Sequence, residues 1–297
     1  MIKRTLEELN LIDDFLMNCI ATDPEVGEPF FRKLLSVLLQ RDIGRVRVTA
    51  QPIIPGNDTT LRGIRMDVEV DEAAGPEGDD SVANVYDIEP HTKRDQDFPR
   101  HNRFYQAKID SRHLKSGVKD FAKLPNLYII TITNFDVFME DYMMYTFRNS
   151  CVELPQLKYD DGLCYVYFNT TGKKGGSQSI KNMLNYIQRS AEESVADEAT
   201  GEIDAYVKRV KANPALQEGI MTLGDYFDQE RQEEHQETMV QCIVELLEDI
   251  GPVPDDLLNR LEQITDLDEL SRLLKVAAHA GSIAGFEEAM QKESVVA

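Results

Sequence analysis

The feature that most restricts the fold is a run of almost continuous apolar and β-branched residues, LYIITIT, at positions 127–133. Such runs are typical of strands covered on both faces, as in parallel sheets with helices on each side. The preceding residues 100–123 place apolar side chains at three- and four-residue spacing, which predicts a helix. A helix followed by a strand that is buried on both faces indicates an α/β core.

Other regular patterns lie on both sides of this unit. Residues 44–54, 64–70 and 84–89 alternate enough to be strands and are separated by turn and loop residues, so we expect an antiparallel meander. The expected fold is therefore α/β, with a central mixed sheet flanked by helices. The remaining predicted elements are helices at 6–21, 27–40 and 177–193 and strands at 142–148 and 163–169.

The last third of the chain has a different character. Beyond residue 200 no strand pattern is found, and helices are predicted at 202–212, 222–249, 255–263 and 266–278. Residues 191–297 hold 25 Asp and Glu against 8 Lys and Arg, a balance of −17, which leaves only −4 for residues 1–190. The overall acidity therefore does not exclude a nucleic-acid partner. We expect one domain at residues 1–200 and an acidic, all-helical C-terminal appendage at residues 201–297.

Several classes of protein and site find no support. The chain has no run of about 18 apolar residues, and acids interrupt its first residues, so we expect no membrane span, no signal peptide and a cytoplasmic protein. The four cysteines are far apart and lack histidines at ligand spacing, which argues against a zinc site and a disulfide framework. We expect buried free thiols at Cys19, Cys151, Cys164 and Cys242.

Two acidic residues stand where a strand is expected to be partly buried. Asp67 is flanked by Met66 and Val68, and Glu89 follows Ile88 at the end of another predicted strand. Burying a charged group is costly unless it meets an opposite charge, and carboxylates side by side attract a divalent cation. Oxygen ligands of this kind suit Mg²⁺ or Mn²⁺. The alternative is that both acids point to solvent from half-exposed strands.

Four blocks of the sequence occur in a recognisable order and at compatible spacing. They are RMDV at 65–68, YDIEPH at 86–91, RHNRFYQ at 100–106 and LYIITITNFD at 127–136. Together they resemble the recombination-promoting nuclease and putative transposase branch of the PD-(D/E)XK nuclease superfamily. The resemblance covers roughly residues 6–200. It implies a restriction-endonuclease-like core and an Mg²⁺-dependent DNA endonuclease acting in DNA rearrangement, with Asp67 and Glu89 as the metal-binding carboxylates.

The sequence departs from the superfamily pattern near both acids. His91 stands where most members have Lys and this branch often has Gln, and Met66 replaces the Pro of the name-giving motif. Histidine titrates near neutral pH, so His91 is a candidate base for the attacking water, although the change also fits a weakened site. Glu25 or Glu28 is a candidate for the helix acid that commonly helps to hold the metal, although acids at a helix start also favour the dipole.

The predicted helix at 100–123 carries a basic face as well as an apolar one. Arg100, Arg103, Lys108 and Arg112 are our candidates for DNA backbone contacts, since cations on one stripe neutralise phosphates without reading bases. A solvated helix face explains the same spacing. The leading hypothesis is DNA cleavage. The alternative is a catalytically silent nuclease-fold module that binds DNA, or that binds a protein or itself through the C-terminal helices.

Overall fold

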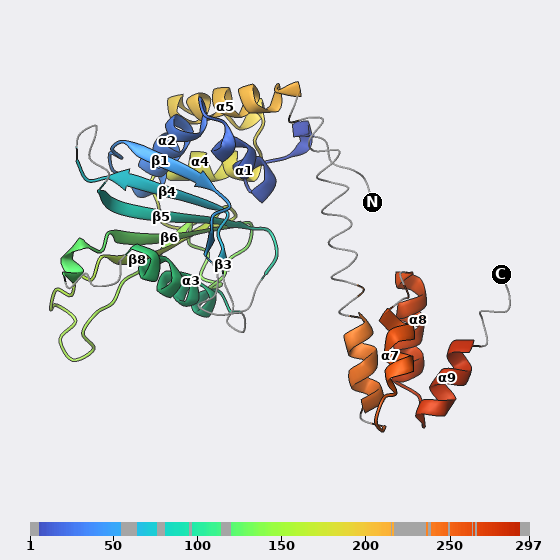
Figure 1. Ribbon diagram of the computed structural model, residues 1–297. Helices are drawn as coiled ribbons and strands as arrows, with labels where there is room; N and C mark the ends of the chain where they lie inside the picture. Colours follow the sequence, from blue (N-terminus) through green and yellow to red (C-terminus); the bar gives the residue numbers. More distant parts are fainter. Residues whose placement is uncertain are drawn as a thin grey trace. The chain divides into compact units, whose positions relative to one another are not determined.

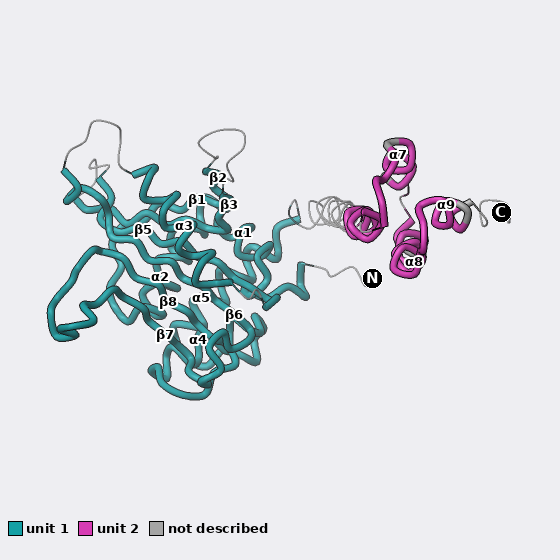
Figure 2. Tube along the Cα trace, turned by 90° about the horizontal axis from the view of Figure 1, so that it is seen from below, with its two compact units in different colours: residues 1–217 teal, residues 218–297 magenta. Residues whose placement is uncertain are grey.

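The computed structural model describes residues 6–54, 64–75, 81–94, 97–113, 120–214, 216, 236, 239–248, 250–262, 264 and 266–291. The chain divides into two compact units, residues 1–217 and residues 218–297 (Figure 2).

The first unit is built on a six-stranded mixed sheet with the strand order β1-β4-β5-β6-β8-β7 (Figure 1). Neighbouring strands β1, β4 and β5 are antiparallel, β5, β6 and β8 are parallel, and β7 is antiparallel to β8. The predicted mixed sheet is therefore confirmed. The strands are β1 (Val46–Ala50), β4 (Val68–Ala73), β5 (Val82–His91), β6 (Asn126–Thr133), β7 (Met144–Phe147) and β8 (Leu163–Asn169).

Strand β6 holds the middle of the sheet, as its apolar sequence predicts. Its residues Ile129 to Thr133 are all buried, because β5 and β8 lie on either side and helices cover both faces. Helices α1, α2, α4 and α5 lie on one side of the sheet and α3 lies on the other (Figure 1). The helices are α1 (Asp14–Thr22), α2 (Gly27–Leu39), α3 (Phe98–His113), α4 (Gln178–Gln188) and α5 (Glu198–Lys211).

Two predicted strands are each broken in the structure. The segment 44–54 becomes β1 and a two-residue strand β2 (Ile53–Ile54), because Gln51 adopts a left-handed backbone with φ 46°. The segment 64–70 becomes β3 (Ile64–Arg65) and β4, with a bend at 66–67. Strands β2 and β3 form a separate antiparallel pair. Asp67 therefore does not lie inside a strand, as we predicted, but immediately before β4.

Several predicted helices have different ends. The predicted helix at 6–21 is a 3₁₀ turn, η1 (Leu6–Glu8), followed by α1. The predicted helix at 177–193 ends at Gln188 and is followed by a second turn, η3 (Glu192–Ser194). The predicted helix at 100–123 begins at Phe98 and runs to His113; residues 114–119 lie outside the described part, and a 3₁₀ turn, η2, follows at Phe121–Lys123.

The described residues of the second unit are helical. They comprise a helical segment at 239–248 and the helices α7 (Asp255–Glu262), α8 (Leu267–Ala277) and α9 (Ile283–Gln291), the last of which was not predicted. Leu247, Leu257, Leu261, Leu270 and Phe286 are fully buried in a core of their own. None of the described helices of the chain combines the length and the apolar character needed to cross a membrane.

The cysteines differ in exposure. Cys19 and Cys164 are buried, as predicted, whereas Cys151 is half-buried and Cys242 is exposed, so the prediction is wrong for Cys242.

Candidate functional site

Asp67 and Glu89 lie side by side on neighbouring strands. Val68, the first residue of β4, pairs with Ile88 of β5, so the preceding Asp67 falls opposite Glu89. The backbone N–H of Asp67 donates a hydrogen bond of 3.0 Å to Oε1 of Glu89. Glu89 is buried and Asp67 is half-buried. The structure thus brings together the two acids that the sequence analysis assigned to the metal.

A third carboxyl, which the sequence analysis did not single out, lies beside them. Asp87 precedes Glu89 by two residues on β5, so strand alternation turns both side chains to the same face, and Asp87 is completely buried. Neither of its oxygens accepts a hydrogen bond from a donor in the described residues. The charges of Glu69 and Asp67 act on this carboxyl, and its own charge acts on Glu89. Asp87 therefore adds a third acidic group to the pair of Asp67 and Glu89.

Burial raises the pKa of all three carboxyls, and the charge of a nearby acid adds to it in each case. Burial raises the pKa of Asp67 to about 7, and the charge of Asp14 adds to this while Arg65 opposes it. Burial is also the main reason that the pKa of Asp87 rises to about 8. The pKa of Glu89 is raised by burial, then by the charges of Asp87 and Asp67. Crowded carboxyls of this kind lose their protons most readily when a cation binds beside them.

A helix acid other than the two that we predicted acts on Asp67. Asp14, the exposed first residue of α1, is the acid whose charge raises the pKa of Asp67. The carboxylate of Glu25 is instead paired with Arg209 of α5, and Glu28 lies in the first turn of α2. The sequence analysis missed Asp14 because it began the first helix at residue 6, which placed this acid in the middle of a helix rather than at its start.

His91 is at the end of β5, within reach of Glu89. Its Nε2 lies 4.0 Å from Oε2 of Glu89. The ring contacts Phe98 edge-on at a centroid distance of 5.0 Å and lies nearly perpendicular to the ring of His101 at 6.1 Å. The site therefore contains two imidazoles, and the second, His101, lies in the block at 100–106 but was not predicted as a site residue.

Three of the four predicted DNA-contacting residues lie on the outer part of α3. Arg103 is exposed, and Arg100 is exposed with its guanidinium 3.9 Å from Asp97. The ammonium of Lys108 lies over the ring of Phe104, 5.7 Å from its centroid.

Arg112 is the exception. Its guanidinium forms an ion pair with the buried carboxylate of Glu69 on β4. Glu69 is the register partner of Asp87, so Arg112 neutralises the acidic cluster from one end. In this structure the guanidinium of Arg112 is thus engaged with a carboxylate, and its contact with a DNA phosphate stays a prediction.

The donor set fits one hard divalent cation held by few protein ligands. No group of three or more His, Cys, Asp or Glu within the described ranges is arranged to hold a metal ion. Mg²⁺ usually takes only one or two carboxylates and keeps water and substrate phosphates as its other ligands. Asp67 and Glu89 supply two such oxygen donors, and burial is the main cause that raises the pKa of each.

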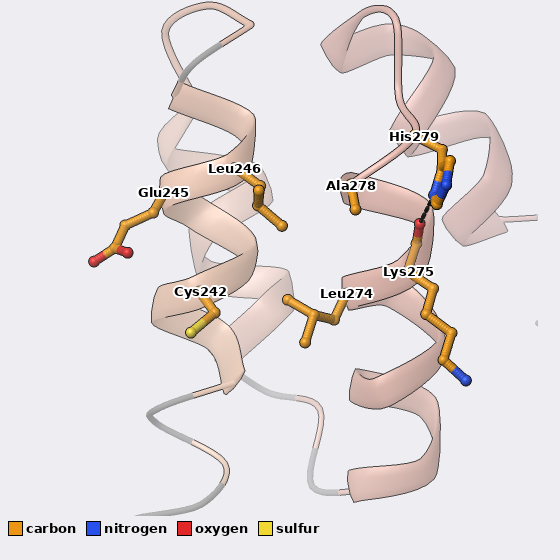
Figure 3. A pocket seen from close by; sticks show the side chains of 7 residues that line it. All are labelled: Cys242, Glu245, Leu246, Leu274, Lys275, Ala278 and His279. Carbon is orange, nitrogen blue, oxygen red and sulfur yellow. Dashed lines mark hydrogen bonds between the residues drawn. The ribbon is translucent and has the colours of Figure 1, made fainter.

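A cavity of about 690 Å³ lies in the second unit, between the segment 239–248 and α8 (Figure 3). On its wall, Nδ1 of His279 is bonded to the backbone oxygen of Lys275 at 2.8 Å. Glu245 is the one carboxylate that lines it, so it offers no counterpart to the acidic pair of the first unit. The lining residues are Cys242, Glu245, Leu246, Leu274, Lys275, Ala278 and His279.

Comparisons with known proteins were made at the level of families, sequences and structures. No family model matches the chain, and no curated protein or solved structure matches it either.

Proposed function

We propose that the first unit is an Mg²⁺-dependent DNA endonuclease of the PD-(D/E)XK type, related to the recombination-promoting nucleases and putative transposases. The observation that carries this proposal is the side-by-side placement of Asp67 and Glu89, in which the backbone N–H of Asp67 donates to Oε1 of Glu89 at 3.0 Å. The third buried acid, Asp87, increases the electrostatic demand for a cation at this point. The choice of DNA as the substrate comes from the family resemblance that the four sequence blocks carry.

Each residue of the site has a distinct role in this reaction. Asp67 and Glu89 hold the ion, which when bound polarises the scissile phosphate and lowers the pKa of the attacking water. His91, beside Glu89, accepts the proton that the water loses. Arg100, Arg103 and Lys108 hold the DNA backbone.

The test is nicking of a supercoiled plasmid by the full chain in Mg²⁺ or Mn²⁺. Asp67→Asn and Glu89→Gln each keep the side-chain shape and remove the charge that binds the ion, so we expect about a 100-fold or larger loss of rate. Glu25→Gln is the matched control, because it also removes an acid but one that is paired with Arg209. Equal nicking by the wild type and the Glu89→Gln variant would exclude this site.

A second function is favoured by two observations. Position 91 holds a histidine in place of the usual Lys, and the guanidinium of Arg112 is already paired with Glu69. A catalytically silent module with the same fold would bind DNA in a salt-dependent way, or a protein through the acidic C-terminal unit. DNA binding without Mg²⁺-dependent nicking identifies this alternative.

A further inference from the structure

A buried asparagine joins α3 to the sheet beside the acidic cluster. Asn102 is 1% exposed, and its Nδ2 donates to Oγ1 of Thr131 and to the hydroxyl of Tyr167, both at 3.0 Å. Thr131 of β6 is the register partner of Glu89, and Tyr167 is that of Thr131. Asn102 is therefore fixed beside the row of register partners Glu89, Thr131 and Tyr167, which runs across three neighbouring strands. With its amide nitrogen used in this way, its oxygen remains as an acceptor.

That oxygen determines which nitrogen of His101 carries a proton. Nδ1 of His101 lies 3.2 Å from Oδ1 of Asn102. An amide oxygen only accepts, so Nδ1 is the donor and carries the hydrogen. Nε2 is then the nitrogen that gains and loses a proton, and it has no hydrogen-bond partner within the described part of the chain.

The ring of His101 is also fixed from a second side. It packs on Tyr105 at a centroid distance of 4.1 Å and an interplanar angle of 33°. The hydroxyl of Tyr105 in turn donates to the backbone oxygen of Arg65 at 2.9 Å, two residues before Asp67. An imidazole that is half-buried, oriented by a buried amide and placed 6.1 Å from His91 has the features of an acid–base group rather than a surface histidine.

Hydrolysis of a phosphodiester moves two protons. One leaves the attacking water, and the other joins the oxygen that departs from phosphorus. His91 accounts for the first, and no residue assigned above accounts for the second. A proton donor on the other side of the phosphate completes the balance.

We propose that His101 is the general acid of this site and that Asn102 is the residue that positions it. The inference rests on the proposed nuclease function. As the water oxygen bonds to phosphorus, its proton passes to His91. The bond from phosphorus to the leaving oxygen breaks, its electron pair stays on that oxygen, and the oxygen takes the proton from Nε2 of His101. The products are a phosphate monoester and an alcohol, and both imidazoles then exchange protons with solvent.

Two substrates with different leaving groups test the role of His101. DNA releases an alkoxide that needs a proton, whereas bis(4-nitrophenyl) phosphate releases a phenolate that is stable without one. In the full chain, His101→Gln should lower plasmid nicking about 100-fold and lower 4-nitrophenolate release less than about 3-fold. Asp67→Asn should lower both, and His279→Gln in the second unit should lower neither. Equal losses on the two substrates in His101→Gln, or no loss on DNA, would overturn the assignment.

A second measurement addresses Asn102 without reference to activity. The chain has five histidines, so long-range ¹H–¹⁵N spectra of the ¹⁵N-histidine-labelled protein should resolve each ring, with His101→Gln identifying the signal. We expect His101 to show the tautomer with hydrogen on Nδ1. His279 is an internal reference, because its Nδ1 is bonded to the oxygen of Lys275 at 2.8 Å. Asn102→Ala should abolish this preference at His101 alone, and a wild-type signal with hydrogen on Nε2 would contradict the proposal.

If the nuclease function itself is wrong, the cleavage assays and the tautomer measurement give different answers. The wild type then cleaves neither substrate in Mg²⁺ or Mn²⁺, while the tautomer measurement still reports whether Asn102 orients His101. If only the present inference is wrong, the wild type and Asp67→Asn behave as proposed and His101→Gln does not.

Discussion

Asp87 is the residue whose surroundings depart most from those of an ordinary strand acid. It is fully buried without a hydrogen-bond donor in the described residues, and burial raises its pKa to about 8. An unfolded chain would release this proton near pH 4. Between those two values the folded protein therefore holds a proton that the unfolded chain has lost.

The stability of the metal-free protein should consequently fall as pH rises. The contribution of Asp87 is fully present below about pH 4 and is lost as pH passes through about 8, because the folded state then contains a buried charge. In EDTA, we expect the Tm of the wild type to drop by several degrees between pH 6 and pH 8.5. Asp87→Asn is neutral throughout and should reduce the drop. Equal slopes for the two proteins would show that Asp87 is already ionised at pH 6.

Some of the site was accessible to residue-level reasoning and some was not. Asp67 and Glu89 could be paired from their places on two neighbouring predicted strands, although the break before β4 was not predicted. In the sequence, Asp87 cannot be distinguished from an acid on a half-exposed strand. Its burial depends on elements that pack on the sheet from elsewhere in the chain. The role of Asn102 depends on Thr131 and Tyr167, which are 29 and 65 residues away.

At the level of elements, α3 divides its basic residues between two tasks. Arg103 is exposed, whereas Arg112 reaches across to Glu69, whose side chain is only 6% exposed. Both belong to the basic residues predicted on the helix at 100–123, and the sequence contains nothing about a partner 43 residues away. The two arginines therefore offer a matched pair of substitutions on one helix.

Arg112→Ala should destabilise the protein and Arg103→Ala should not. Removing Arg112 leaves the Glu69 carboxylate buried without its cation, and because Arg112 is about one-third exposed we expect a loss of about 1–3 kcal/mol in the free energy of unfolding. Arg103→Ala should leave the Tm unchanged and weaken DNA binding. It should also reduce the slope of log K against log salt by about 1.

Denaturant unfolding and fluorescence anisotropy on a DNA duplex in EDTA measure the two effects. If Arg112→Ala weakened DNA binding without a loss of stability, Arg112 would return to the set of phosphate-binding residues.

The elements themselves were easier to predict than their ends. Strand β6 was recognisable because a run of β-branched residues has no other stable place than the middle of a covered sheet. The break between β1 and β2 was not recognisable, because it depends on a left-handed backbone at Gln51 and glutamine rarely adopts that conformation. The first helix was predicted too early, since residues 6–13 carry apolar side chains at helical spacing but form only a short turn before α1.

On the scale of the whole chain, the boundary between the units decides which experiments are informative. The predicted division at residue 200 falls inside α5, whereas the first compact unit extends to residue 217. The apolar face of α5 is buried through Ile203, Val207 and Val210. The hydroxyl of Tyr186 on α4 donates to Oδ1 of Asp204 on α5 at 2.9 Å. Helix α5 is thus part of the first unit.

Truncation after residue 217 and truncation after residue 197 should therefore behave differently. The longer fragment keeps α5 and should unfold cooperatively with a Tm close to that of the first unit in the full chain. The shorter fragment loses three buried aliphatic side chains, worth about 1.5–3 kcal/mol each, and should be unfolded or at least 10 °C less stable. Circular dichroism and calorimetry distinguish these outcomes, and two fragments of equal stability would place α5 outside the unit.

The longer fragment also tests whether the acidic region restrains DNA binding. Residues 218–297 hold 19 Asp and Glu against 5 Lys and Arg, a balance of −14, so their removal takes away two thirds of the net charge of −21. Repulsion between this charge and DNA slows association and is screened by salt. We expect fragment 1–217 to bind and nick DNA faster than the full chain at low ionic strength, with the difference vanishing near 0.5 M salt. A difference that persisted there would point to a direct, short-range block of the site rather than to long-range repulsion.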